Sequence, residues 1–131
     1  MTVRVFTTGV FDLFHTGHLR ALIKAKSHGD YLLVGVCNDE ETRDYKRLPI
    51  IPLEQRLEIV RAIDCVDEAF ESPVYTTEKF YRENEIDIHC QGDPILDHYT
   101  VGEKLGILRN TGRDPEVDTT MLIKRILGRD K

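Results

Sequence analysis

Two histidines, three residues apart, are the side chains whose types and spacing best suit chemistry. His15 and His18 end the stretch "GVFDLFHTGH" (9–18), which follows a β-branched run and precedes a helical pattern. The start of a helix carries partial positive charge from unpaired N–H groups, so a histidine cation is disfavoured there unless an anion lies nearby. The stretch therefore predicts a site for a negatively charged ligand, with both imidazoles pointing at one group.

Glycines in the same stretch would let an anion approach the backbone. Gly9 permits a tight turn, and Gly17 keeps the first helical turn free of a side chain. We expect Thr16 to cap this helix. The alternative is that the two histidines are surface residues and the glycines only make a turn, which two histidines in this glycine context disfavour.

Charge restricts the partners that the chain is expected to bind. Lys and Arg number 18 against 23 Asp and Glu, a net charge of −5, which argues against a general nucleic-acid or anionic-membrane surface. Lys46, Arg47 and Arg56 would by themselves predict only solvated surface, because charged side chains mostly stay exposed. Any phosphate site must therefore be built locally.

The cysteines indicate the cellular compartment, and the apolar runs indicate whether the chain could span a membrane. The three cysteines form no C-x-x-C pair, and their odd number without a secretory leader predicts reduced thiols in a cytoplasmic protein. The longest apolar runs are strand-sized, well short of the roughly 20 residues of a membrane span. We expect neither a membrane segment nor a nucleic-acid partner.

Strand-like runs alternate with helical patterns along the whole chain. The strands are expected at 3–9, 31–37, 65–70, 86–92 and 106–108. The helices are expected at 17–28, from Pro52 onward, and at 76–85, 97–105 and 119–127, the last with Met121 or Leu122 and Ile126 facing the core. Runs such as "YLLVGV" are apolar on both faces, which is typical of a parallel sheet covered by helices on each side.

We therefore predict one α/β domain over residues 1–131, a Rossmann-like parallel sheet of about five strands with helices on both faces. Ligands of such sheets bind beyond the carboxyl ends of the strands, often at the first strand–helix turn. The stretch with the two histidines is that turn.

This stretch resembles a known family. It matches every fixed position of G-x-F-D-x-x-H-x-G-H, the signature of the cytidylyltransferase branch of the nucleotidyltransferase superfamily. Segments 29–41 and 46–69 are similar to that family's second strand and to its lysine-to-arginine segment. The resemblance implies transfer of CMP from CTP to a small alcohol phosphate or phosphonate, with release of pyrophosphate. It also implies Mg²⁺ with the triphosphate and a homodimer.

The resemblance further implies roles for individual residues. The catalytic residues would be His15, His18, Lys46 and Arg113. The nucleotide would contact Thr8, Gly9, Val10, Phe11, Gly17, Arg56, Gly92, Thr119 and Thr120. The acceptor would contact Asp12, Asp93, Asp97 and Tyr99. No protein ligand of Mg²⁺ is predicted, since magnesium often binds mainly through substrate phosphates and water.

The family's second signature, R-T-E-G-I-S-T-T, is altered in this chain. The segment "RDPEVDTT" (113–120) keeps the arginine and both threonines but has Asp118 in place of serine. We expect Asp118 to cap the last helix through the N–H of residue 120 or 121, which would leave Arg113 and the Thr119 hydroxyl to meet the nucleotide. The alternative is that the segment is only a loop and a helix cap.

The segment "HCQGDPILDHYT" (89–100) follows the same edge of the predicted sheet. His89 and Cys90 are adjacent strand residues, which point to opposite faces, so core packing is expected rather than a metal pair. Residues 93–100 resemble the choline and ethanolamine enzymes more than the glycerol-phosphate enzymes. Asp93 or Asp97 could meet an amine and Tyr99 a cation, but an uncharged hydroxyalkyl phosphonate would fit a small polar pocket as well.

Three other functions stay open. Related enzymes with the H-x-G-H motif use ATP, so an adenylyltransferase is the nearest alternative. The altered second signature would suit a nucleotide-binding regulator without turnover. The third alternative is a structural α/β module. Nucleotide binding would exclude the last of these.

Overall fold

A five-stranded parallel sheet forms the centre of the computed structural model, which describes residues 1–93 and 95–130. The strands are β1 (Arg4–Gly9), β2 (Tyr31–Cys37), β3 (Glu68–Ser72), β4 (Ile88–Gln91) and β5 (Leu108–Asn110). Their order is β3-β2-β1-β4-β5, and every neighbouring pair is parallel. The order reverses at β1, so a crevice opens beyond the carboxyl end of that strand.

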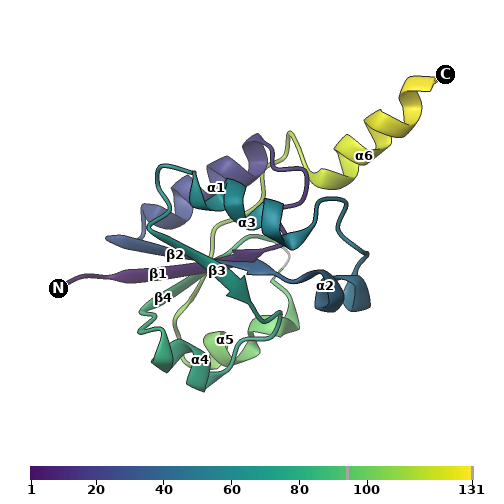
Figure 1. The fold of residues 1–131 in the computed structure, drawn as a ribbon. Helices are drawn as coiled ribbons and strands as arrows, with labels where there is room; N and C mark the ends of the chain where they lie inside the picture. Colours follow the sequence, from purple (N-terminus) through teal and green to yellow (C-terminus); the bar gives the residue numbers. More distant parts are fainter. Residues whose placement is uncertain (94, 131) are drawn as a thin grey trace.

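Helices cover both faces of this sheet. They are α1 (Thr16–Lys26), α2 (Asp39–Tyr45), α3 (Leu53–Arg61), α4 (Glu78–Glu83), α5 (Thr100–Lys104) and α6 (Thr119–Leu127), with 3₁₀ turns η1 (Asp97–Tyr99) and η2 (Gly128–Asp130). Figure 1 shows α1 and α3 on one face and α4 and α5 on the other. The predicted fold class is confirmed.

Each face of the sheet has its own apolar cluster, because successive strand side chains point to opposite sides. Val5 packs with Leu22 of α1 and Val60 of α3, whereas the next residue, Phe6, packs with Tyr81 of α4 and Leu33. This double burial explains why β1 and β2 are apolar at successive positions.

Three elements differ from the sequence-based expectation. The third strand was expected at 65–70 but begins at Glu68, because hydrogen-bonded turns at Ile63 and Val66 hold the preceding residues in a loop. Helix α2 was not predicted, since its acidic sequence lacks an apolar period; Asn38 caps it by accepting from the Glu41 N–H at 2.8 Å. The helix expected at 97–105 divides into η1 and α5.

Helix α6 spans the predicted 119–127, but the prediction that its apolar side faces the core is wrong. Ile126 is 57% exposed, and no residue of α6 is buried. Figure 1 shows α6 projecting away from the sheet. Since α1, α3, α4 and α5 already cover the two faces, no sheet surface remains for its apolar stripe.

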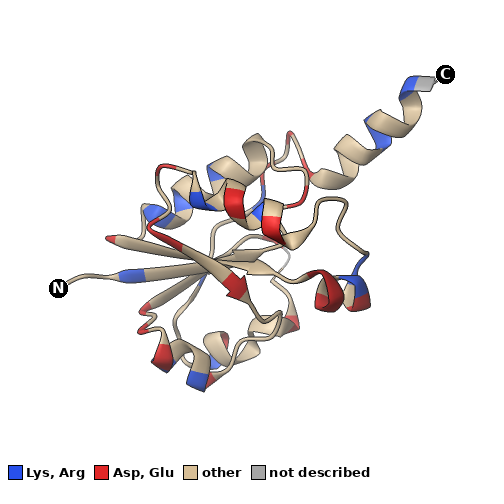
Figure 2. Cartoon of the chain, in the orientation of Figure 1, with Lys and Arg blue, Asp and Glu red and all other residues tan. Residues whose placement is uncertain are grey.

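Charges are distributed unevenly over the helices (Figure 2): α1 and α6 carry Lys and Arg but no Asp or Glu, whereas α2 is mostly acidic. Among the helices of residues 1–93 and 95–130, none combines the length and apolar character needed to cross a membrane.

A hydrogen bond across β2 depends on a glycine. Thr8 of β1 and Ser72 of β3 lie on either side of β2, and their hydroxyl oxygens are 3.0 Å apart. The residue between them is Gly35, and a Cβ atom there would lie 2.3 Å from the Ser72 Oγ. The bridge exists because β2 has no side chain at this point.

We predict that Gly35→Ala lowers the free energy of unfolding by about 1–3 kcal/mol, the usual cost of overpacking a core. Urea titration would measure it. Gly128→Ala is the matched control, because a Cβ at Gly128 has no neighbour within 4 Å. An unfolding midpoint of Gly35→Ala equal to that of the wild type would contradict the packing described.

Candidate active site

The two histidines of the first turn cap the start of α1 reciprocally. The Nδ1 atom of His15 accepts from the Gly17 N–H at 3.0 Å, and Nδ1 of His18 accepts from the His15 N–H at 3.1 Å. The helix cap is therefore His15, and the expectation that Thr16 would cap the helix is wrong. Since both Nδ1 atoms accept, each neutral ring carries its proton on Nε2 in these assigned tautomers. The Nε2 of His15 lies 3.4 Å from the Thr119 hydroxyl oxygen, and that of His18 makes no hydrogen bond to a described residue.

The glycine between the histidines is required by this cap. The His15 ring folds back over the first turn, so a Cβ on Gly17 would lie 2.8 Å from the ring's Cε1. The two imidazoles stack, with ring centroids 3.9 Å apart. The spacing of the motif thus places two N–H donors side by side.

Burial keeps both histidines uncharged. Desolvation lowers the pKa of His18 to about 3, and repulsion from Lys46, and from His15 whenever that ring is protonated, adds to the effect. Desolvation also lowers the pKa of His15, although Asp118 and Asp114 oppose it. At neutral pH the pair therefore offers hydrogen-bond donors to an anion without a positive charge at the helix start, where one would be unfavourable.

Asp12 anchors the loop between β1 and α1. Two neighbours of Asp12, Phe11 and Leu13, have positive φ angles of 54° and 50°, a conformation that costs side-chain-bearing residues energy. The Asp12 carboxylate accepts from the N–H groups of Ile50 and Ile51 at 2.8 and 2.9 Å, and from Arg47 Nη1 at 3.1 Å. Burial alone would raise the pKa of Asp12, but these hydrogen bonds lower it. They hold the strained loop against residues 47–51.

Arg56 lies behind the site rather than in it. Its side chain is 0% exposed. Nη1 donates to the carbonyl oxygens of Val10 and Cys37 at 2.6 and 2.9 Å, Nε donates to that of Ile51 at 2.7 Å, and Nη2 pairs with Asp39. This geometry does not support the predicted contact between Arg56 and the nucleotide. Every nitrogen of the guanidinium bonds to the protein, and Arg56 lines neither of the two cavities described next.

Two cavities open beyond the carboxyl ends of the strands. The loop cavity, of about 300 Å³, lies beside residues 112–120, and the strand cavity, of about 250 Å³, lies over the ends of β1 and β4. Both are lined by His18, Lys46, Gly92 and Thr119. The cavities therefore meet at the groups best suited to stabilise negative charge.

Most of the predicted site residues line one of these cavities. The loop cavity has His15, Gly17, Asp93, Arg113 and Thr120 in addition to the shared residues. The strand cavity has Thr8, Gly9, Val10, Phe11, Asp12 and Tyr99. Asp97 lines neither and is exposed at the start of η1, so the geometry does not support the predicted acceptor contact. Pro94, within the predicted acceptor segment, lies outside the described residues.

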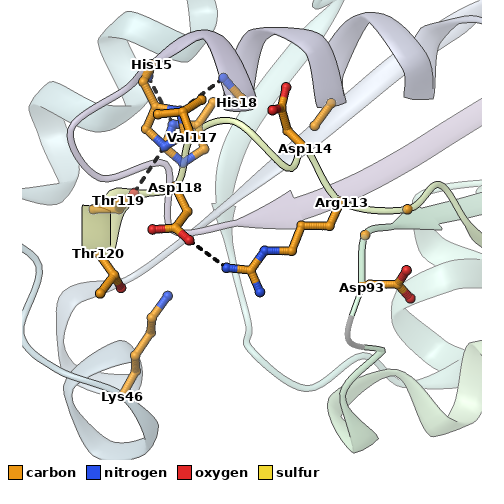
Figure 3. A pocket seen from close by; sticks show the side chains of 14 residues that line it. His15, His18, Lys46, Asp93, Arg113, Asp114, Val117, Asp118, Thr119 and Thr120 are labelled. Carbon is orange, nitrogen blue, oxygen red and sulfur yellow. Dashed lines mark hydrogen bonds and ion pairs between the residues drawn. The ribbon is translucent and has the colours of Figure 1, made fainter. Parts of the chain in front are cut away.

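Lys46 and Arg113 point into the space below the histidines from opposite sides (Figure 3).

As predicted, Asp118 caps α6, since its Oδ1 accepts from the Met121 N–H at 2.8 Å. Its Oδ2 accepts from Arg113 Nη2, also at 2.8 Å. The Thr119 hydroxyl donates to the Asp12 carbonyl oxygen at 3.1 Å. Arg113 and Thr119, expected to meet the nucleotide, thus line the loop cavity and also bond to Asp118 and Asp12.

Gln91 and Tyr45 are among the residues of the strand cavity that the sequence interpretation missed. Gln91 ends β4 beside Thr8 of β1, so the rule that neighbouring parallel strands end at one edge would have found it. The expectation for His89 and Cys90 is confirmed: both are buried, His89 against Phe6 and Cys90 in the α1–α3 cluster.

Carboxylates near the loop cavity are already engaged. Asp114 accepts from Arg20 at 2.9 Å, and Asp118 from Arg113 and Met121. Within residues 1–93 and 95–130, no group of three or more His, Cys, Asp or Glu side chains is placed to hold a metal ion.

The crevice where the strand order reverses and its clustered donors suit a ligand that carries phosphate groups. The family model described as cytidylyltransferase-like matches residues 6–125, and the chain belongs to that family.

Individual relatives agree with this assignment. The chain is 37% identical to the ethanolamine-phosphate cytidylyltransferase of Arabidopsis thaliana and 36% identical to choline-phosphate cytidylyltransferase A of Rattus norvegicus, in each case over 95% of this chain. It covers 32% and 36% of those proteins, about a third of their length. Among solved structures, the lipopolysaccharide core biosynthesis protein of Thermoplasma volcanium superposes with a TM-score of 0.72 at 32% identity, covering 90% of this chain and 100% of that one.

The depressed pKa of His18 predicts a pH-dependent stability. Between its unfolded value of 6.5 and its folded value of about 3, the unfolded chain binds the extra proton, so stability is complete above pH 6.5 and falls with decreasing pH. Replacing His18 by Asn, which keeps an oxygen acceptor for the cap, should reduce the slope of unfolding free energy between about pH 6 and pH 4 by about 1.4 kcal/mol per pH unit.

Urea titrations at a series of pH values would measure this slope. His15 and His89 also have lowered pKa values and are present in both proteins, so the difference reports His18 together with its effect on the neighbouring His15. The exposed His28 supplies the control variant, His28→Asn. Equal slopes for the wild type and His18→Asn would contradict the assigned neutral state.

Proposed function

We propose that the chain transfers CMP from CTP to a small alcohol phosphate or phosphonate and releases pyrophosphate. The observation that carries the proposal is the junction of the two cavities, where the neutral His18 and the cationic Lys46 line both. The family membership and the names of the relatives support it, since these are cytidylyltransferases of ethanolamine phosphate and choline phosphate.

The two cavities suit two substrates. We assign the nucleotide to the loop cavity and the acceptor to the strand cavity, so that the acceptor oxygen and the α-phosphorus meet at His18 and Lys46. Under this assignment Thr8, Gly9, Val10 and Phe11, expected at the nucleotide, would lie beside the acceptor, and Asp93, expected at the acceptor, would lie beside the nucleotide. The acceptor oxygen attacks in line, a P–O bond forms, and the bond to the departing pyrophosphate breaks. Such a reaction depends mainly on positioning and on stabilising charge on the phosphoryl oxygens.

The hydrogen bonds of the histidines define their part in this reaction. Nδ1 of each ring is occupied by the helix cap, and Nε2 carries the proton, so neither ring is free to remove a proton. A phosphate or phosphonate oxygen is already ionised at neutral pH, so the reaction needs no general base. His18 donates near the α-phosphate together with Lys46 and Arg113, and His15 donates toward the β- and γ-phosphates.

Mg²⁺ would accompany the triphosphate. Since the carboxylates near the loop cavity are bonded to protein groups, phosphate oxygens and water would hold the ion. We also propose that the protein is a homodimer, as the family resemblance implies, and that it is cytoplasmic, as the cysteine usage predicts. Light scattering of the purified protein would measure the subunit number.

Pyrophosphate release with CTP and with ATP, across a panel of phosphorylated alcohols, tests the proposal. We expect release with CTP. Release with ATP alone would indicate an adenylyltransferase, and nucleotide binding by calorimetry without any release would indicate a regulator.

We predict that His18→Ala lowers turnover by a factor of about 100 or more, because a preorganised donor to transition-state charge is typically worth that much. His15→Ala should also be severe. Circular dichroism would establish that the variants are folded, and His28→Ala is the control. Near-normal turnover in folded His18→Ala would refute the assigned role.

We predict that Asp118→Ser leaves thermal stability nearly unchanged and maintains or improves the apparent affinity for CTP. Serine is a capable helix cap, and removing the carboxylate frees Arg113 from its 2.8 Å ion pair. Thr119→Ala and Arg113→Ala should instead weaken the use of CTP. Loss of activity in Asp118→Ser with an altered Mg²⁺ dependence would identify the carboxylate as a metal ligand.

A further inference from the structure

The side-chain amide of Gln91 is oriented by the backbone of β1. One amide atom lies 2.9 Å from the Thr8 N–H and must therefore be the oxygen, because a backbone N–H needs an acceptor. This assigns the Gln91 Oε1, and the NH₂ group points the other way. The NH₂ group makes no hydrogen bond to any described residue, and Gln91 lines the strand cavity.

His89 locks this orientation from the other side. Its Nε2 lies 3.0 Å from the Gln91 Oε1, so it must carry the proton and donate it. Its Nδ1 lies 2.7 Å from the Tyr81 hydroxyl oxygen, which also lies 2.8 Å from the Thr76 Oγ1. His89 is 0% exposed, so this network is shielded from water. A preorganised donor thus faces the strand cavity, with its orientation fixed by two elements of the sheet.

The charged residues that line the strand cavity leave an excess of positive charge. Asp12 is the only acidic residue among those lining it, and its carboxylate is occupied by Arg47 and by the N–H groups of Ile50 and Ile51. Lys46 also lines this cavity. An ammonium group would therefore find two cations and a paired carboxylate, an unfavourable setting. A hydroxyl or other uncharged oxygen would find a donor in Gln91.

We propose that the acceptor ends in an uncharged, oxygen-bearing group, and that Gln91 binds this group while His89 acts as a positioning residue. The inference rests on the proposed function and narrows its substrate class. It separates this chain from the relatives named for ethanolamine phosphate and choline phosphate, whose substrates carry a cation.

The test compares glycerol 3-phosphate, which has free hydroxyls, with O-phosphoethanolamine and phosphocholine. We expect glycerol 3-phosphate to have the highest kcat/KM with CTP, by a factor of about 10 or more, since an unmatched polar group in a site costs at least that much. Calorimetry in the presence of CTP measures acceptor binding separately from turnover. Absence of turnover with every acceptor would refute the proposed function, and the order of binding would still decide the inference.

Gln91→Glu is the critical variant. Its carboxylate keeps one oxygen for Thr8 and His89 and presents the other to the cavity in place of NH₂. We expect the ratio of kcat/KM for O-phosphoethanolamine to that for glycerol 3-phosphate to rise by about 10-fold or more, with the KM for CTP within about 2-fold of the wild type. Gln55→Glu, the same change at an exposed position of α3, is the matched control.

Arg47→Met provides a second variant should Gln91→Glu fail to fold. It removes the cation paired with the Asp12 Oδ2, which keeps its hydrogen bond from the Ile50 N–H, and should raise the same ratio because the carboxylate charge is no longer balanced. His89→Phe should raise the KM for the acceptor while leaving that for CTP unchanged. Preference of the wild type for either ammonium acceptor, or an unchanged ratio in both charge variants, would overturn the inference.

Discussion

The reciprocal cap at the start of α1 is the interaction on which the active site depends. Two orphan N–H groups of the first turn are satisfied by imidazole Nδ1 atoms instead of by the usual hydroxyl or carboxylate oxygens. One pair of hydrogen bonds thus starts the helix, assigns the tautomers of His15 and His18, and leaves their Nε2–H groups as donors. Because Gly17 must lack a side chain for the His15 ring to fold back, local folding and chemistry share one motif.

Buried charged residues hold the surrounding loops in register with that cap. Asp12 binds the backbone of residues 50 and 51, and Arg56 gathers carbonyl oxygens from three segments. Neither needs to touch a ligand to matter, since each satisfies polar groups that burial would otherwise leave unpaired. The donors that face a substrate, such as Lys46, stand on segments that these two residues tie together.

The residues where the two cavities meet and those of the strand cavity alone suit different parts of the proposed reaction. His18 and Lys46 lie where the two cavities meet, which is where we propose that the phosphoryl groups bind. Gln91 and Tyr99 line the strand cavity alone, where we propose that one acceptor is distinguished from another. A fixed phosphate site beside a variable cavity fits the range of acceptors named among the relatives.

Local sequence patterns were sufficient to predict the α/β sheet, the paired histidines and the cap of α6 by Asp118, because strand alternation, motif spacing and capping act over a few residues. They were not sufficient for Arg56, whose carbonyl partners lie up to 46 residues away, nor for the Arg113–Asp118 pair or the exposed side of α6. Gln91 faces the strand cavity only because β4 pairs with β1 and His89 donates to its amide oxygen. Such placements depend on which surfaces remain uncovered and which polar groups remain unpaired once the chain has packed. A local sequence pattern contains no information about either.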